Sequence, residues 1–244
     1  MTHLLRAELL KVLTLRASYL ALGVTVVAAA GLTALITHTV ATGETDLTAR
    51  REVLTLAGTS VAPAMALLLA MLVVGSEFRH NTITPALLIT PNRRRLFLAK
   101  AGVSAAVGVV VALLAILFGW AGGAVTLAAV GSRPLLDTGD LGSLTAASVG
   151  VSVLYSLAGT SIATWLRNPT TALIVVLSAL YVVDPLASLA IPARWMPGGA
   201  TELIAHATVA AHPAWPWAAV AVLAGYAAVL AVTSLRFAAP RDLS

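Results

Sequence analysis

The chain has 244 residues, of which 59% are hydrophobic and 10% are charged, and it contains no cysteine. Soluble domains carry about 25% charged residues, so this composition excludes an ordinary soluble domain and indicates an integral membrane protein. The lack of cysteine excludes disulfide bonds, thiolate metal sites and thiol nucleophiles. The formal net charge is +5. In a membrane protein, the side of the membrane on which each Lys or Arg lies matters more than this total, so the charge does not indicate a nucleic-acid partner and none is expected.

The chain opens with MTHLLRAELLKVLTLR, a basic and imperfectly amphipathic segment. We expect an N-terminal interfacial helix over residues 1–16 that lies on the inner membrane surface, with a frayed basic tail as the alternative. The apolar run that follows has about 21 residues, which is longer than the apolar part of a cleavable signal peptide. It is therefore expected to remain as the first span.

Six apolar segments are each about 20 residues or longer, which is enough to cross a hydrocarbon core of roughly 30 Å. Helices pair every backbone group within the segment, and the alternation of membrane strands is missing, so the predicted fold is all-α. The third segment exceeds what a bilayer needs, so it either tilts or projects beyond the lipid. Within a transmembrane domain over residues 17–237, the predicted spans are residues 17–37, 57–75, 101–130, 144–166, 171–191 and 216–237.

The distribution of Lys and Arg predicts the orientation of these spans. With the N-terminus inside, eleven of the fifteen basic residues fall on the cytoplasmic side. This positive-inside bias predicts that both termini, including the tail over residues 238–244, are cytoplasmic. It also places the loop over residues 77–100 in the cytoplasm.

This cytoplasmic loop lies within GSEFRHNTITPALLITPNRRRLFLAK, residues 75–100. Thr84 is a good N-cap, Pro85 suits the first helical position, and Pro91 disfavours helical geometry at Thr90. The result is a helix of about one and a half turns, too short to be stable alone in water, so it needs a surface to dock on. Its apolar face consists of Ile83, Leu87 and Leu88. The arginines at residues 93–95 and Lys100 are expected to fix the loop at the interface. In the alternative interpretation, the loop is solvated and its arginines bind anionic headgroups.

A set of residues along this loop resembles the segment between the second and third spans of type-2 ABC transporter permeases, most closely the small six-span permeases of actinobacteria. The set consists of Glu77, Arg79, Thr82, Ile83, Leu87, Leu88, Thr90, Pro91, Arg94, Arg95 and Lys100. The resemblance implies that Thr82 to Thr90 form a coupling helix that contacts an ATP-binding subunit, after a charged turn at Glu77 and Arg79. The family usually has Gly where this chain has Asn81, and Asn tolerates a left-handed backbone better than most residues.

The resemblance implies a transport subunit rather than an enzyme. A P-loop needs Gly-Lys followed by Ser or Thr, and neither of the two lysines, Lys11 and Lys100, follows a glycine. ATP and Mg are therefore expected on two copies of a separate ABC ATPase subunit, with no cofactor bound by this chain. A second permease copy is expected, as a homodimer or with a related heterodimer partner, in the bacterial plasma (inner) membrane.

Several alternatives stay open at this point. Export is expected, but import is not strictly excluded. The cargo could be a drug, a lipid, a peptide or a polyketide. The competing class is a non-ABC membrane protein, such as a channel, a scaffold or an intramembrane enzyme, whose basic loop binds lipid headgroups.

Three further features lie in the second half of the chain, at or between the predicted spans. Residues 192–215 are apolar but interrupted by proline, which predicts a re-entrant or interfacial outer segment before the last span. Asp184 either lines the translocation pathway or closes a polar gate, and in the competing interpretation it is hydrated because Pro185 ends the fifth span. Arg167 and Asn168 either contact the cytoplasm or the ATPase, or form a plain hairpin turn.

Glu202 and His206 are four residues apart, a spacing that would suit two metal ligands on one helical face, with His212 as a third. An ordinary polar helix surface is the better explanation, and no metal site is predicted. Sequence motifs of zinc proteases and of serine hydrolases do not occur in the chain.

Overall fold

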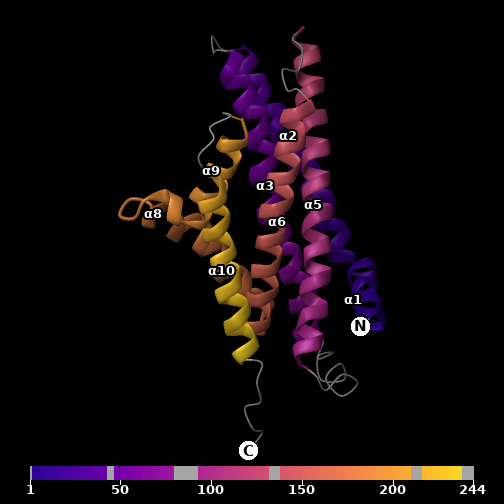
Figure 1. Cartoon of the computed structure of the whole chain (residues 1–244). Helices are drawn as coiled ribbons and strands as arrows, with labels where there is room; N and C mark the ends of the chain where they lie inside the picture. The colour runs from indigo at the N-terminus through magenta and orange to yellow at the C-terminus, as the bar shows by residue number, and fades with distance from the viewer. Residues whose placement is uncertain (1, 43–46, 80–92, 132–137, 210–215, 238–244) are drawn as a thin grey trace, which may run out of the picture.

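The computed structural model describes residues 2–42, 47–79, 93–131, 138–209 and 216–237. All regular elements among these residues are helices, arranged as a bundle of long helices with shorter ones at its side (Figure 1). In chain order they are α1 (Thr2–Thr14), α2 (Arg16–Thr42), α3 (Leu47–Arg79), α5 (Arg93–Ala129), α6 (Thr138–Leu166), α7 (Pro169–Ser178), η1 (Ala179–Val183), α8 (Asp184–Ala187), η2 (Ala193–Trp195), α9 (Pro197–Val209) and α10 (Pro216–Phe237).

Six helical segments are long and apolar enough to cross a membrane. This confirms the predicted all-helical, multi-pass class for the described residues. The candidate spans are Arg16–Thr42, Ser60–Arg79, Arg95–Ala129, Leu141–Leu166, Pro169–Ala187 and Trp217–Ser234. The helix of the sixth predicted span has the predicted bounds, whereas α3, α5 and α6 extend beyond theirs because their polar ends remain helical.

The length of α5 resolves the alternative between tilting and projecting. It has 37 residues, which corresponds to about 55 Å at 1.5 Å per residue. A helix tilted by about 40° crosses a 30 Å core with about 39 Å of its length. A span as long as α5 would therefore project beyond a hydrocarbon core of this thickness at any ordinary tilt.

The core lies between α3 and its neighbours. Helix α3 contacts α2, α5, α6, α7 and α9. Glycine allows one of the closest approaches, because a Cβ on Gly159 of α6 would lie 2.5 Å from the carbonyl oxygen of Leu67 in α3. Small residues commonly permit such backbone contact between membrane helices.

The fifth span is built from three consecutive helical segments. Asn168 caps α7, since the N–H groups of Thr170 and Thr171 donate to its Oδ1 at 3.0 and 3.3 Å. The helix then passes through the π-turn η1 into α8, so Pro185 does not end the span, which continues to Ala187. Pro185 is tolerated there because it occupies the first turn of α8, where a missing N–H costs little.

The turn before α7 has the local features of a hairpin. Arg167 has a φ of +55°, and its side chain and that of Asn168 are exposed. At the same end of the bundle lie α1 and the C-terminal end of α10 (Figure 1). The described ends of α3 and α5 also meet here, on either side of residues 80–92.

Candidate functional site: a buried charge cluster

Two carboxylates and two ammonium groups meet where α1 packs beside the end of α3 and the start of α5. We call Glu8, Lys11, Glu77 and Lys100 the charge cluster. Lys11 Nζ donates to Oε1 of Glu8 at 2.8 Å and to Oε1 of Glu77 at 3.0 Å. Lys100 Nζ donates to Oε1 and Oε2 of Glu8 at 3.3 and 3.1 Å, and it also donates to Oε1 of Glu77. Each lysine thus bonds both glutamates, and the four side chains form a closed ring.

Three members of the ring are almost completely removed from solvent. Glu8 and Glu77 are 4% exposed and Lys100 is 5% exposed, whereas the side chain of Lys11 is 39% exposed. The two negative and two positive charges balance. In a low-dielectric interior their attraction is strong, but so is the cost of desolvating them, so an unmatched charge here is expensive.

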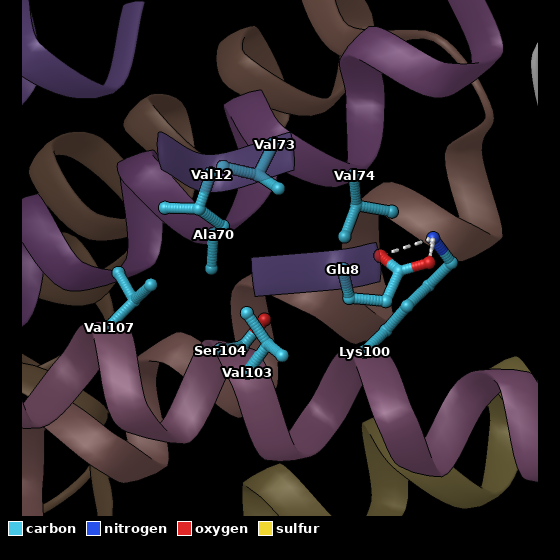
Figure 2. A pocket seen from close by; sticks show the side chains of 9 residues that line it. All are labelled: Glu8, Val12, Ala70, Val73, Val74, Lys100, Val103, Ser104 and Val107. Atoms are coloured by element: carbon cyan, nitrogen blue, oxygen red, sulfur yellow. Dashed lines mark hydrogen bonds and ion pairs between the residues drawn. The ribbon is translucent and has the colours of Figure 1, made fainter. Parts of the chain in front are cut away.

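A small cavity adjoins the ring on the side facing the bundle (Figure 2). Its volume of about 10 Å³ is close to the least that holds one water molecule. Glu8, Lys100 and Ser104 supply its polar lining, and the remaining lining residues are Val12, Ala70, Val73, Val74, Val103 and Val107. The charges therefore lie against a wall made mostly of valine, which keeps their surroundings apolar.

Lys11 is the member of the ring that faces water. Burial disfavours its charged form, but hydrogen bonds and charge from Glu8 and Glu77 outweigh burial, so the pKa of Lys11 is raised above its ordinary value of 10.5. At neutral pH this side chain is therefore an ammonium group. It closes the ring from the solvent side.

Helical spacing explains why these residues face inward. On α1, Glu8 and Lys11 are three residues apart, and Val12 next to them is also buried. On α5, Lys100 is followed by the buried residues Val103 and Val107 at helical intervals. The same face of α5 that enters the apolar core therefore carries Lys100 with it.

The structure places the residues that the resemblance singled out in several environments. Glu77 is buried in the charge cluster, whereas Arg79 is exposed two residues later. Both belong to the last turn of α3, where the resemblance implies a charged turn. Arg94 lies in the first turn of α5, and the side chain of Arg95 is exposed. The remaining positions lie outside the described residues: Thr82, Ile83, Leu87, Leu88, Thr90 and Pro91.

Lys100 was expected beside Arg93, Arg94 and Arg95 at the membrane interface, and the structure buries its ammonium group against Glu8 and Glu77. Since α5 begins at Arg93, Lys100 lies two turns inside the helix and on its core-facing side. Glu8 and Lys11 were not predicted as site residues. Their spacing on one helix was a local signal, but nothing local indicates that Glu8 meets a lysine 92 residues away.

A second polar arrangement lies beside the segment that the sequence predicts to be outer, where side chains of α8 and α6 meet the start of α9. The N–H of Gly198 donates to Oδ1 of Asp184 at 3.4 Å. The Thr201 hydroxyl donates to the Pro197 carbonyl at 2.8 Å, so the Tyr155 hydroxyl is the donor in its 3.1 Å bond to Thr201 Oγ1. We call these bonds the outer contact. Asp184 is half-buried in it, rather than fully hydrated.

Glu202 and His206 are the pair whose spacing would suit metal ligands, although no metal site was predicted there. Glu202 is exposed on α9, and the side chains of His206 and His212 lie outside the described ones. Among the side chains that are described, no group of three His, Cys, Asp or Glu is placed to hold a metal ion.

No family model matches the chain, and no curated protein is similar enough to count as a match.

Proposed function

We propose that the chain is the membrane-spanning permease subunit of an ABC exporter, which forms the translocation pathway and is driven by a separate ATP-binding subunit. The sequence pattern around residues 77–100 and the six membrane-length helices support this proposal. The charge cluster supports it most directly. It joins the two helices that flank the segment in which the docking helix is predicted.

Glu77 precedes residues 80–92 and Lys100 follows them, and their side chains are bonded to each other. A displacement of the intervening segment therefore acts on α3 and α5 together, because separating Glu77 from Lys100 would leave unpaired charges in an apolar setting. Glu8 and Lys11 add α1 to the same unit. The cluster thus favours concerted movement over independent movement of the three helices.

Contacts around the cluster extend this unit to other spans. A Cβ on Gly75 of α3 would lie 2.7 Å from Cβ of Pro169, so the end of α3 packs directly on the start of α7. The hydroxyl of Tyr19 in α2 donates to the carbonyl of Leu13 in α1 at 2.7 Å. Force applied beside the cluster would therefore reach the first, second, third and fifth spans.

ATP can drive such a movement only if its binding to the partner subunit favours one arrangement of the spans over another. ATP and Mg are held by the ATPase in this proposal, and the permease makes and breaks no covalent bonds. A second permease copy completes the pathway in the bacterial plasma membrane. On the opposite side, Asp184 and α9 form the pathway's outer polar element, since α9 folds back against α3, α6 and α10.

The proposal is tested through the predicted docking helix. The genes beside that of this chain are first searched for one that encodes a P-loop protein. The chain is co-expressed with that protein, and the ATPase retained per permease is measured after purification. Leu87→Asp and Leu88→Asp are expected to reduce retention at least tenfold, because each puts a charge into an apolar contact. Ile89→Asp is the matched control, since 100° per residue places Ile89 across the helix from the apolar face.

Membrane insertion of each variant is measured in parallel, so that loss of binding is separated from loss of folding. Retention that is unchanged by Leu87→Asp and Leu88→Asp would count against the docking helix. An adjacent gene without a P-loop protein, together with no nucleotide hydrolysis by purified complexes, would overturn the permease proposal.

A further inference from the structure

Asp184 lies apart from the other charged residues of the membrane-length helices. It is about 20 Å along the fifth candidate span from Pro169. A carboxylate at such a depth is costly unless a positive charge or several hydrogen bonds compensate it. All other Asp, Glu, Lys and Arg residues of the six candidate spans lie at or near the span ends beside α1: Arg16, Glu77, Arg79, Arg95 and Lys100.

The described part of the chain compensates Asp184 only in part. Its carboxylate accepts the 3.4 Å bond from the N–H of Gly198, although a carboxylate has about four acceptor sites. The N-terminal end of α9 carries roughly half a positive charge. Among the described side chains, no Lys, Arg or His forms an ion pair with Asp184, and the guanidinium of Arg194 lies over the ring of Trp195 instead. A full positive charge for Asp184 is therefore expected from another molecule.

A second carboxylate lies on the same side of α9. Glu202 follows Gly198 by four residues, which places it one turn along and about 40° around the helix. Its side chain is exposed, and within the described ranges it forms no ion pair. Two carboxylates without basic partners make the potential beside the start of α9 negative, which favours a cation there.

The surface around Asp184 is apolar. No residue of η1 or α8 is buried, and α8 stands at the side of the bundle (Figure 1). Tyr181, Val183 and Leu186 are 67%, 57% and 61% exposed. A carboxylate within such a surface suits a ligand that combines a positive charge with large apolar groups, and the exposed ring of Tyr181 can also attract a cation.

A metal ion fits this place poorly. Hard ions such as Ca²⁺ take about six or more oxygen ligands. The hydroxyl groups of Tyr155 and Thr201 already donate within the outer contact, and one carboxylate supplies too few oxygens to replace a hydration shell. An organic ammonium or phosphonium ion needs no such shell, because its apolar groups surround the charge.

We propose that Asp184 anchors a binding site for a hydrophobic organic cation. The carboxylate pairs with the positive charge, Glu202 strengthens the negative potential, and the exposed side chains of η1 and α8 contact the apolar part. The assignment of such a cation as the cargo rests on the proposed permease function, whereas its binding does not.

Binding is measured with labelled tetraphenylphosphonium on the purified full-length protein in lipid nanodiscs, with empty nanodiscs as the background. Tetraphenylborate, an anion of the same shape, is the matched control ligand and should not bind above background. Asp184→Asn removes the charge but keeps an oxygen that can accept from the N–H of Gly198, so its stability in the sodium dodecyl sulfate titration should be unchanged. We expect Asp184→Asn to lower the affinity for tetraphenylphosphonium roughly tenfold or more, and the exposed Glu202→Gln to lower it roughly twofold.

Equal binding of the cation and the anion would overturn the proposal, because the site would then recognise apolar surface alone. Unchanged affinity in Asp184→Asn would also overturn it, as would a lack of saturable binding by the wild-type chain, for example because a basic side chain of a second copy already pairs with Asp184. ATP-driven movement of tetraphenylphosphonium by proteoliposomes that contain the partner ATPase tests the cargo separately. Binding without movement would overturn the cargo assignment but not the binding site, whereas the docking-helix variants test the permease proposal alone.

Discussion

The charge cluster and the outer contact hold helices together in different ways. In the charge cluster, four charged side chains from three helices bond one another, and three of them are shielded from solvent. In the outer contact, a single half-buried carboxylate accepts a long hydrogen bond from a backbone N–H, and two hydroxyl groups add a neutral bond. The first arrangement depends on charge balance, whereas the second depends on the placement of dipoles.

This difference has mechanical consequences. Separating the members of the charge cluster exposes charge to an apolar wall, so α1, α3 and α5 are expected to move as one body. Separating Asp184 from Gly198 costs one hydrogen bond, which water can replace because the carboxylate is only half-buried. In the proposed permease, the end with the cluster would therefore transmit force, and the end with the outer contact would open and close.

Removing Lys100 should have the largest effect. Lys100→Met keeps a similar volume but leaves the two glutamates with only Lys11, and we expect the free energy of unfolding to fall by about 3–5 kcal/mol. Unfolding by sodium dodecyl sulfate in mixed micelles measures the change. Lys11→Met, at the solvent-facing position of the same ring, is the matched comparison and should cost about 1 kcal/mol.

Charge balance can be separated from packing with a second substitution. Adding Glu8→Gln to Lys100→Met restores a neutral set of side chains, so the double variant should be more stable than Lys100→Met alone. If the two losses instead add, the ring acts through packing rather than charge, and the contrast with the outer contact is lost.

The sequence was sufficient to predict the helices but not the ring. Apolar length predicted six spans because each span must satisfy its own backbone groups in lipid. The polar ends of α3, α5 and α6 were missed because a hydropathy pattern ends where the apolar residues end, while the helix continues. Lys100 was assigned to the interface because it precedes the third apolar run, although α5 already includes it. Its burial depends on which face of α5 meets α1, and the hydropathy pattern does not show that.

Asp184 illustrates another limit of sequence. Its proximity to Pro185 suggested two outcomes, a charge within the span or a hydrated end. In the structure the helix continues through a π-turn, so Asp184 lies inside the fifth candidate span, and α9 returns to place Gly198 beside its carboxylate. The proline pattern indicated a broken outer segment, but a contact across 14 residues depends on tertiary packing.

A smaller effect is expected from the outer contact. Asp184→Ala removes an acceptor from the first turn of α9, and such losses cost about 1 kcal/mol. Gly198→Ala should cost a similar amount, because its Cβ would displace the same carboxylate. The double variant should therefore cost no more than either single variant, measured by the same unfolding titration. Additive losses would show that Asp184 and Gly198 act independently.

The smallest effect concerns pH and the solvent-facing member of the charge cluster. The pKa of Lys11 is raised on folding, so its contribution to stability is complete below its unfolded value of about 10.5 and is lost as the pH rises through the folded value. Solvent screening limits this contribution to about 1 kcal/mol or less. The unfolding titration is repeated from neutral pH to above pH 10.5, with Lys11→Met as the control, and the wild-type chain should lose its advantage over Lys11→Met only at the alkaline end. A constant difference across that range would mean that Lys11 stabilises the ring through its aliphatic stem, and the cluster would then resemble the outer contact in depending on placement rather than on charge.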